Sequence, residues 1–336
     1  LNIKGLGDNP SWTMKGTAFQ GYNSGDMIKF GQPTADGKHM LIFGRDRSAD
    51  SGRGPVQVYE WDGATWKQKG ADLFPQESGN DTAVMGSSIS DDGETIVVSE
   101  GLMDTPNGEN SGRVRVFDWN GTDWVQRGVA IDGEHANDVM TQYGISADGN
   151  TILTNSRLND DGGTDVGQAR VFDWDGSAWV QRGSAFNGAA DGDNIRSLLS
   201  KNGNSVAITA GTANATLGID AKKGTTTIYD WNGSSWTQRG TAIEGLDDGD
   251  EARVSGFTSD MNTISISSSV FDDGGADDTN KGHVRVFDWD GSSWVQRGRT
   301  LTGSVAVDMF GVLTIPSSLA TSLSVNALDF NGATGG

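Results

Sequence analysis

One fifteen-residue motif, repeated along a chain of 336 residues, limits what this protein can fold into more than any other feature. The motif reads VRVFDWNGTDWVQRG at 114–128 and recurs at 169–183, 227–240 and 284–298, with a more divergent copy at 56–70. Self-similarity at a fixed period indicates a repeat architecture, in which one supersecondary unit is stacked many times. The first tryptophans of the copies, spaced by 58, 55, 57 and 58 residues, are Trp61, Trp119, Trp174, Trp231 and Trp289.

Each copy of the motif predicts a β-hairpin. Its alternating first half is typical of a strand, Asn-Gly or Asp-Gly marks a turn, and the second half returns. In that register Asp118 lies opposite Val125 and diagonal to Arg127, and the divergent copy keeps the charge pair as Glu60 and Lys69. We expect this ion pair to be exposed on the outer edge of the hairpin.

The two tryptophans of each copy are separated by four residues, which predicts a cross-strand aromatic pair. Because one pair recurs at the same hairpin position in every repeat, we interpret the tryptophans as packing groups rather than as a sugar-binding surface. A partly exposed belt of tryptophans that serves an assembly interface is the alternative. The predicted structural aromatic residues are Trp12, Trp61, Trp66, Trp119, Trp124, Trp174, Trp179, Trp231, Trp236, Trp289, Trp294 and Phe330.

Two further strands are predicted upstream of each hairpin. In one repeat they span 143–146 and 151–155, and the turn Ala147-Asp148-Gly149-Asn150 joins them. The same pattern occurs in the other complete repeats. Four strands in a repeat of this length are typical of a β-propeller blade.

The two ends of the chain carry the two halves of a sixth copy. Residues 11–16 match its second half and 325–332 its first half. We expect 11–16 to pair with 323–330 in one blade, with Trp12 facing Phe330. Completing one blade from both ends removes edges that would otherwise aggregate. We therefore predict an all-β fold, a single domain over 1–336: a six-bladed β-propeller with four-stranded blades and a ring closed by strands from both termini. The blade repeats end near 70, 128, 183, 240 and 298, and the sixth blade combines 299–332 with 1–16.

The charge of the chain restricts its partners. It has 45 acidic and 25 basic side chains, a formal net charge of −20. Because this charge repels phosphates, we expect no nucleic acid partner and no attraction to anionic membranes. No apolar run approaches the roughly 20 residues of a membrane helix, so we expect no membrane insertion. The absence of cysteine excludes disulfides, thiolate nucleophiles and sulfur-ligated zinc.

The elements of a blade also resemble those of a known family. A strand with Phe310-Gly311 or Tyr143-Gly144 and a Ser-x-Asp-Gly-x-Thr-Ile turn at 90–96 and 146–152 are followed by an acidic glycine-rich loop and then by Gly-x-Val-Arg-Val-Phe-Asp-Trp. This order resembles FG-GAP-type repeat propellers, a family that includes the integrin α-subunit head and many bacterial, algal and viral surface proteins. The resemblance covers nearly the whole chain and implies the propeller fold.

Two acidic loops between second and third strands are candidate calcium sites. Carboxylates and amides on a tight, glycine-rich turn are the oxygen ligands that Ca²⁺ requires. In the resembled family such a loop can hold calcium, although Gly163 and Gly274 stand here where ligands are expected. Ordinary solvated acidic turns are the alternative, so calcium is an optional cofactor and no other is expected. The candidate ligands are Asn159, Asp161, Asp165, Asp272, Asp273 and Asp277.

No set of residues predicts a catalytic site. His39, His135 and His283 occupy three different positions within their repeats, so we interpret them as solvated or structural. We predict a non-catalytic structural or recognition module of the adhesion type, located extracellularly or on a cell or virion surface. Its expected partners are a protein or glycan ligand or neighbouring subunits of an assembly. The alternative is a carbohydrate-active propeller enzyme, a glycoside hydrolase or polysaccharide lyase.

Overall fold

The structure, a computed structural model, describes residues 14–19, 27–45, 54–76, 86–211, 223–247, 250–268, 282–303, 314–316 and 323–325. All regular secondary structure in these residues is β-strand, which confirms the predicted all-β class. No helix in the described part of the chain is long and apolar enough to cross a membrane.

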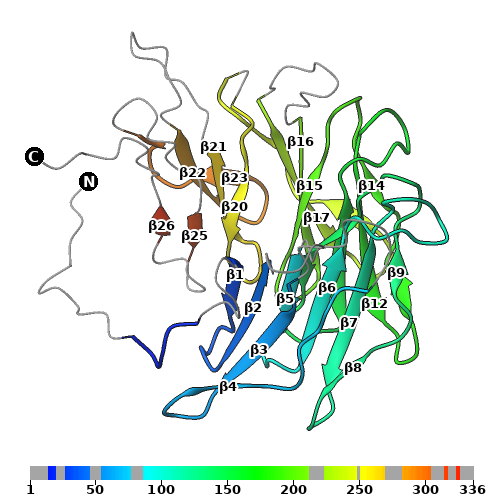
Figure 1. Ribbon diagram of the computed structural model, residues 1–336. Coiled ribbons are helices and arrows are strands. Elements are labelled where there is room, and N and C mark those ends of the chain that lie inside the picture. Colours follow the sequence, from blue (N-terminus) through cyan, green and yellow to red (C-terminus); the bar gives the residue numbers. More distant parts are fainter. Residues whose placement is uncertain are drawn as a thin grey trace, which may run out of the picture.

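The described strands form five antiparallel four-stranded sheets, which we number as blades 1 to 5 in chain order (Figure 1). In each blade the strands are paired in the order in which they occur in the chain, as predicted. Blade 1 contains β1 (Met27–Pro33), β2 (His39–Arg45), β3 (Val56–Trp61) and β4 (Trp66–Gln68). Blade 2 contains β5 (Gly86–Ile89), β6 (Thr95–Glu100), β7 (Arg113–Trp119) and β8 (Trp124–Gln126). Blade 3 contains β10 (Thr141–Ile145), β11 (Thr151–Ser156), β12 (Gln168–Trp174) and β13 (Trp179–Gln181). Blade 4 contains β15 (Arg196–Leu199), β16 (Ser205–Ala210), β17 (Thr225–Trp231) and β18 (Trp236–Gln238), and blade 5 contains β20 (Arg253–Phe257), β21 (Thr263–Ser268), β22 (His283–Trp289) and β23 (Trp294–Gln296).

The predicted hairpin register is confirmed. In blade 2, Trp119 pairs with Trp124 and Asp118 with Val125. Beyond residues 127–130 the outer strand returns to the same partner, and a short strand at 131–132 pairs with the beginning of β7. These short continuations are β9 (Ile131–Asp132), β14 (Phe186–Asn187), β19 (Ile243–Glu244) and β24 (Leu301–Thr302).

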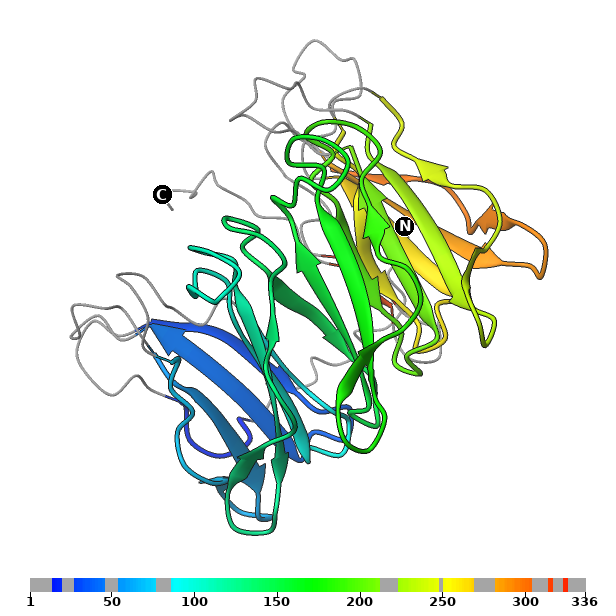
Figure 2. The same cartoon turned by 90° about the vertical axis from the view of Figure 1, so that its right-hand side faces the viewer.

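The hydrophobic core lies between consecutive blades. Every residue of β6 is buried, because alternate side chains of this second strand enter two different interfaces. Ile96 and Val98 pack into the cluster shared with blade 1, whereas Val97 packs into the cluster shared with blade 3. Two more such clusters join blades 3 and 4 and blades 4 and 5. Sheets stacked face to face in this way, from blade 1 in blue to blade 5 in orange, define a β-propeller (Figure 2).

The turns between first and second strands join neighbouring blades at one end of the molecule. Asp91 N donates to Ala147 O, Ala147 N to Lys201 O, and Lys201 N to Ser259 O, so four successive turns are linked by backbone hydrogen bonds. Lys201 also pairs with Asp91, two blades away, at 2.6 Å. The loops between second and third strands, and those between blades, lie at the opposite end of the strands.

Part of the predicted sixth blade is described. β25 (Thr314–Pro316) pairs antiparallel with β26 (Leu323–Val325), and β25 contacts β20 and β21 of blade 5. We expected 323–330 to pair with 11–16, and the described portion pairs with β25. Trp12 and Phe330 lie outside the described residues, so their predicted contact stays a prediction.

Candidate functional sites

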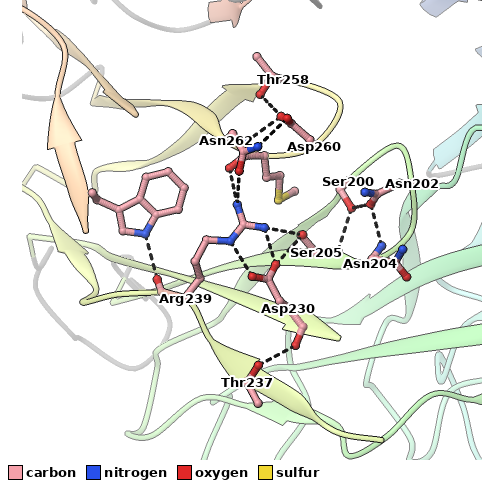
Figure 3. Close-up of polar contacts among 12 residues, drawn as sticks. Ser200, Asn202, Asn204, Ser205, Asp230, Thr237, Arg239, Thr258, Asp260 and Asn262 are labelled. Carbon is pink, nitrogen blue, oxygen red and sulfur yellow. Dashed lines mark hydrogen bonds and ion pairs between the residues drawn. The ribbon is translucent and has the colours of Figure 1, made fainter. Parts of the chain in front are cut away.

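In blades 2 to 4 the motif arginine joins its blade to the next, as Figure 3 shows for blades 4 and 5. Arg239 Nε donates to the Asp230 carboxylate at 2.7 Å, and its Nη2 donates to Ser205 Oγ at 2.9 Å. Its Nη1 crosses to blade 5, where it donates to Met261 O and Asn262 Oδ1 at 2.9 and 3.1 Å. Burial alone would raise the pKa of Asp230, but hydrogen bonds from Arg239 and Ser205 and the charge of Arg239 hold it below its usual value.

The second tryptophan of each hairpin completes this contact, which we call the inter-blade lock. Trp294 Nε1 donates to Arg239 O at 3.0 Å. Gly240, at a φ of +66°, lies so close to Trp289 that a Cβ there would stand 2.6 Å from the indole ring. The same indole-to-carbonyl bond occurs at Trp66 with Lys15, Trp124 with Lys69, Trp179 with Arg127, and Trp236 with Arg182.

Our expectation that the Asp118 and Arg127 pair is exposed on the outer edge is wrong. The Arg127 side chain is only 13% exposed, and its Nη1 donates to Gly149 O in the next blade at 2.9 Å. The sequence correctly predicted that Asp118, in the same blade, is the acidic partner of Arg127. It could not reveal the carbonyl acceptor, because any residue supplies a backbone carbonyl.

The three described candidate calcium ligands do not converge on one point. Asn159 is fully buried, accepts the backbone N–H of Asp161 and donates to Asp138 Oδ2 at 3.2 Å. Asp161 instead lies 3.3 Å from His135 Nε2, and the backbone N–H of Asp165 donates to Asp160. No group of three His, Cys, Asp or Glu that could hold a metal occurs among the described residues. The other three candidates, Asp272, Asp273 and Asp277, lie outside them.

Acidic residues between the blades cap turns. Asp138 Oδ2 accepts the backbone N–H groups of Glu134 and His135, and Asp250 Oδ2 accepts those of Leu246 and Asp247. Burial raises the pKa of both Asp138 and Asp250, and these hydrogen bonds only partly offset it. The repeated acids at this end therefore organise the loops.

The three histidines lie in unrelated surroundings. His283 is fully buried, and burial together with the charge of Arg285 lowers its pKa to about 4. His39 is also buried beside Lys69, and burial lowers its pKa as well. His135 is exposed at the tip of an inter-blade loop. Nothing brings the three together into one site.

An open pocket of about 320 Å³ lies on the outer side of the molecule between blades 3 and 4, where 183–186 of blade 3 meet the hairpin of blade 4; we call it the pocket of blade 4. Its walls include the rings of Phe186, Tyr229 and Trp236, and Phe186 packs against the other two with ring centroids 4.9 and 5.6 Å away. Three serines, Gly183 and Ala185 line the rest, and no charged side chain lines it. The serines are Ser184, Ser234 and Ser235.

Blade 1 carries the same aromatic trio. Phe19 packs against Tyr59 at 4.8 Å and against Trp66 at 5.8 Å. The corresponding residues of blade 5 are Ile243, Phe287 and Trp294, and blades 2 and 3 likewise combine an aliphatic residue with phenylalanine. Sequence reasoning missed this difference between blades. The available signal was a Phe-to-Tyr change in the motif that coincides with an aliphatic-to-Phe change in the continuation of the outer strand.

These blades define the chain as a β-propeller, and comparisons with known proteins agree at the level of fold. No protein-family model and no curated protein matches it. KlAtg21, solved with the coiled-coil of AgAtg16, is similar at a TM-score of 0.57 and 10% identity over 90% of this chain and 78% of that one. A putative 6-phosphogluconolactonase from Bacteroides fragilis is similar at a TM-score of 0.52 and 14% identity over 88% and 75%. At these identities the likeness concerns the fold alone, and nothing in it is specific to FG-GAP repeats.

Proposed function

We propose that this chain is a non-catalytic recognition module that binds a neutral sugar residue of a glycan in the pocket of blade 4. The pocket combines aromatic rings, which pack on the apolar face of a pyranose, with hydroxyl groups that can bond to its hydroxyls. Its volume of about 320 Å³ suits a single sugar residue. This pairing of rings and hydroxyls in one uncharged pocket carries the proposal.

The polar groups of the pocket support a ligand of this kind. Tyr229 Oη and Ser184 Oγ make no hydrogen bond to another described residue, so both are available to a ligand. No acidic side chain lines the pocket, which therefore lacks the carboxylate pair that glycoside hydrolysis uses. A neutral ligand also avoids the repulsion that a net charge of −20 imposes on anions.

We further propose that the propeller has six blades and is closed by both termini, with a role outside the cell or on a cell or virion surface. Lys15 supports the closure, because Trp66 Nε1 donates to its carbonyl at 2.9 Å and its Nζ donates to Gly37 O. Lys69 of blade 1 locks blade 2 through the same two kinds of contact. Residues 15–16 thus stand where the outer strand of a preceding blade would end.

The aromatic trio of blade 1 adds a second site with the same three rings, three blades away. Two weak sites on one rigid body bind a multivalent glycan more tightly than either site alone. This arrangement favours a surface-bound glycan with repeated units as the partner.

A glycan array tests the proposal, and the chain supplies its own control variant. F186I/Y229F converts the trio of blade 4 into the set present in blade 5, and F19I/Y59F does the same in blade 1. We expect the wild type to retain neutral glycans, each double variant to bind them at least tenfold more weakly, and the combined variant to lose them. A wild type that binds no neutral glycan, or a combined variant that binds as well as the wild type, would contradict the proposal.

A further inference from the structure

A second cavity, of about 150 Å³, lies between blades 4 and 5 where their first strands, β15 and β20, begin. Arg196 and Ser197 line it from β15, Thr209 from β16, and Arg253 from β20. The linked turns described above lie at the other end of these strands. The cavity therefore faces the end of the molecule that carries the loops between second and third strands and those between blades, and it is separate from the aromatic pocket.

Two donors in this cavity lack acceptors among the described residues. Ser197 is 2% exposed, and its Oγ has no hydrogen-bond partner there. Arg196 Nε is also buried without a partner, and its guanidinium forms no ion pair with a described acid. Leaving a buried donor unsatisfied typically costs about 1–3 kcal/mol, so such groups are rare in folded proteins unless a ligand satisfies them. Thr209 Oγ1 is bonded to Thr226 Oγ1 and accepts from neither Arg196 Nε nor Ser197 Oγ.

Other arginines of this chain show what Arg196 lacks. Arg113 holds Asp132 through two nitrogens, at 2.6 and 2.9 Å, and Arg182 holds Asp173 at 2.5 Å. With 45 acidic against 25 basic side chains, acidic partners are abundant. Arg115 and Arg285 also have a buried Nε without a partner, but Nη2 of Arg115 donates to Glu100 and Nη2 of Arg285 donates to Glu244 O. The guanidinium of Arg196 has no such hydrogen bond to a described residue, and this distinguishes the cavity.

We propose that the cavity of Arg196, Ser197 and Arg253 binds the carboxylate of a small ligand. Guanidinium groups present planar arrays of donors that match a carboxylate, and Ser197 Oγ adds one further donor. A singly charged carboxylate also meets less repulsion from this acidic chain than a phosphate dianion does. The site takes a carboxylate from either an acidic sugar or a small organic acid, and the choice of probe separates these two sources.

Calorimetric titration of the full chain with glucuronate, acetate, phosphate and glucose tests this site. We expect saturable binding of glucuronate that R196Q weakens at least tenfold and S197A about threefold to tenfold. R299Q is the matched control, because it removes one exposed arginine outside the cavity and should leave binding unchanged. If acetate also binds, the site recognises the carboxylate group alone. If glucuronate binds and acetate does not, the site is specific for acidic sugars.

Three results would overturn the assignment. They are equal weakening by R196Q and R299Q, binding of phosphate without any carboxylate, and loss of glucuronate binding in F186I/Y229F but not in R196Q. Thermal melts supply a readout that is independent of ligand. Because S197A and R196Q remove unsatisfied donors, we expect neither to lower the melting temperature, and a large loss would show that these side chains have structural partners instead.

Discussion

At the scale of single residues, the motif arginine and the second tryptophan hold neighbouring blades together. Arg239 contacts an acid and a hydroxyl in its own blade and two oxygens in the next (Figure 3). Hydrogen bonds that involve a charged group stabilise a fold more than neutral ones do, and removing one partner leaves the other unsatisfied. The recurring motif residues therefore explain stability, whereas the proposed sugar site depends on residues that differ between blades.

Replacing the lock arginine tests this assignment. We expect R239A to lower the free energy of unfolding by about 2–3 kcal/mol, less than for a fully buried pair because Asp230 is about one third exposed. R239K should cost less than half as much, because lysine already fills this position in blade 1 as Lys69. Urea denaturation at pH 7 measures both. A loss below 0.5 kcal/mol for R239A would show that the lock contributes little.

His283 predicts a dependence of stability on pH. Burial, aided by the charge of Arg285, lowers its pKa to about 4, whereas an unfolded histidine titrates near 6.5. As pH falls from 6.5 to 4, the unfolded chain binds a proton that the folded chain does not bind. The folded state therefore loses up to about 3 kcal/mol over this window, and above pH 6.5 this histidine has no effect.

The variant H283Q isolates that contribution, because Gln168 occupies the corresponding strand position in blade 3. Urea denaturation at pH 7 and pH 4.5 should show that the variant loses less stability on acidification than the wild type by about 2–3 kcal/mol. If the stability of the wild type and of the variant depended on pH in the same way, His283 would be protonated in the folded state at pH 4.5.

At the scale of secondary-structure elements, the hairpin is the unit that the sequence describes best. The pairing of Trp119 with Trp124 follows from local spacing and turn residues, so one copy of the motif sufficed to predict it. The indole of the inter-blade lock donates to a backbone carbonyl about 55 positions away. Because every residue has a backbone carbonyl, this contact could not be predicted from residue types. The pocket of blade 4 depends on two substitutions, Phe186 and Tyr229, that become meaningful only when the blades are compared in space.

The two tryptophans of a hairpin should contribute unequally. Trp124 is 7% exposed, belongs to the core shared by blades 1 and 2, and donates to Lys69 O, whereas Trp119 is half-buried beside it. We expect W124A to cost about 3–5 kcal/mol and W119A about 2 kcal/mol. V125A, on the exposed face, should change stability by less than about 0.5 kcal/mol. The opposite ranking of the two tryptophans would place the core on the other side of the hairpin.

At the scale of the whole molecule, the open question of structure is how the sixth blade of the proposed propeller is completed from the two ends of the chain. From blade 1 to blade 5, consecutive blades pack against one another. β25 contacts blade 5 where a sixth blade would begin. Lys15 reaches blade 1 as the lock residues of the other blades reach theirs. The split of one motif between the two ends predicted this arrangement, and a closed ring would hold the two proposed sugar sites at a fixed separation.

Deleting residues 1–16 is the most direct test of that closure, with deletion of 1–9 as the matched control that keeps the motif half at 11–16. We expect the longer deletion to expose an unpaired apolar edge and to promote aggregation. It should also lower the melting temperature by roughly 10 °C or more, as a loss of several kcal/mol in the free energy of unfolding would. The control should melt close to the full chain. A monomeric 1–16 deletion that melts at the wild-type temperature would contradict a ring closed by both termini.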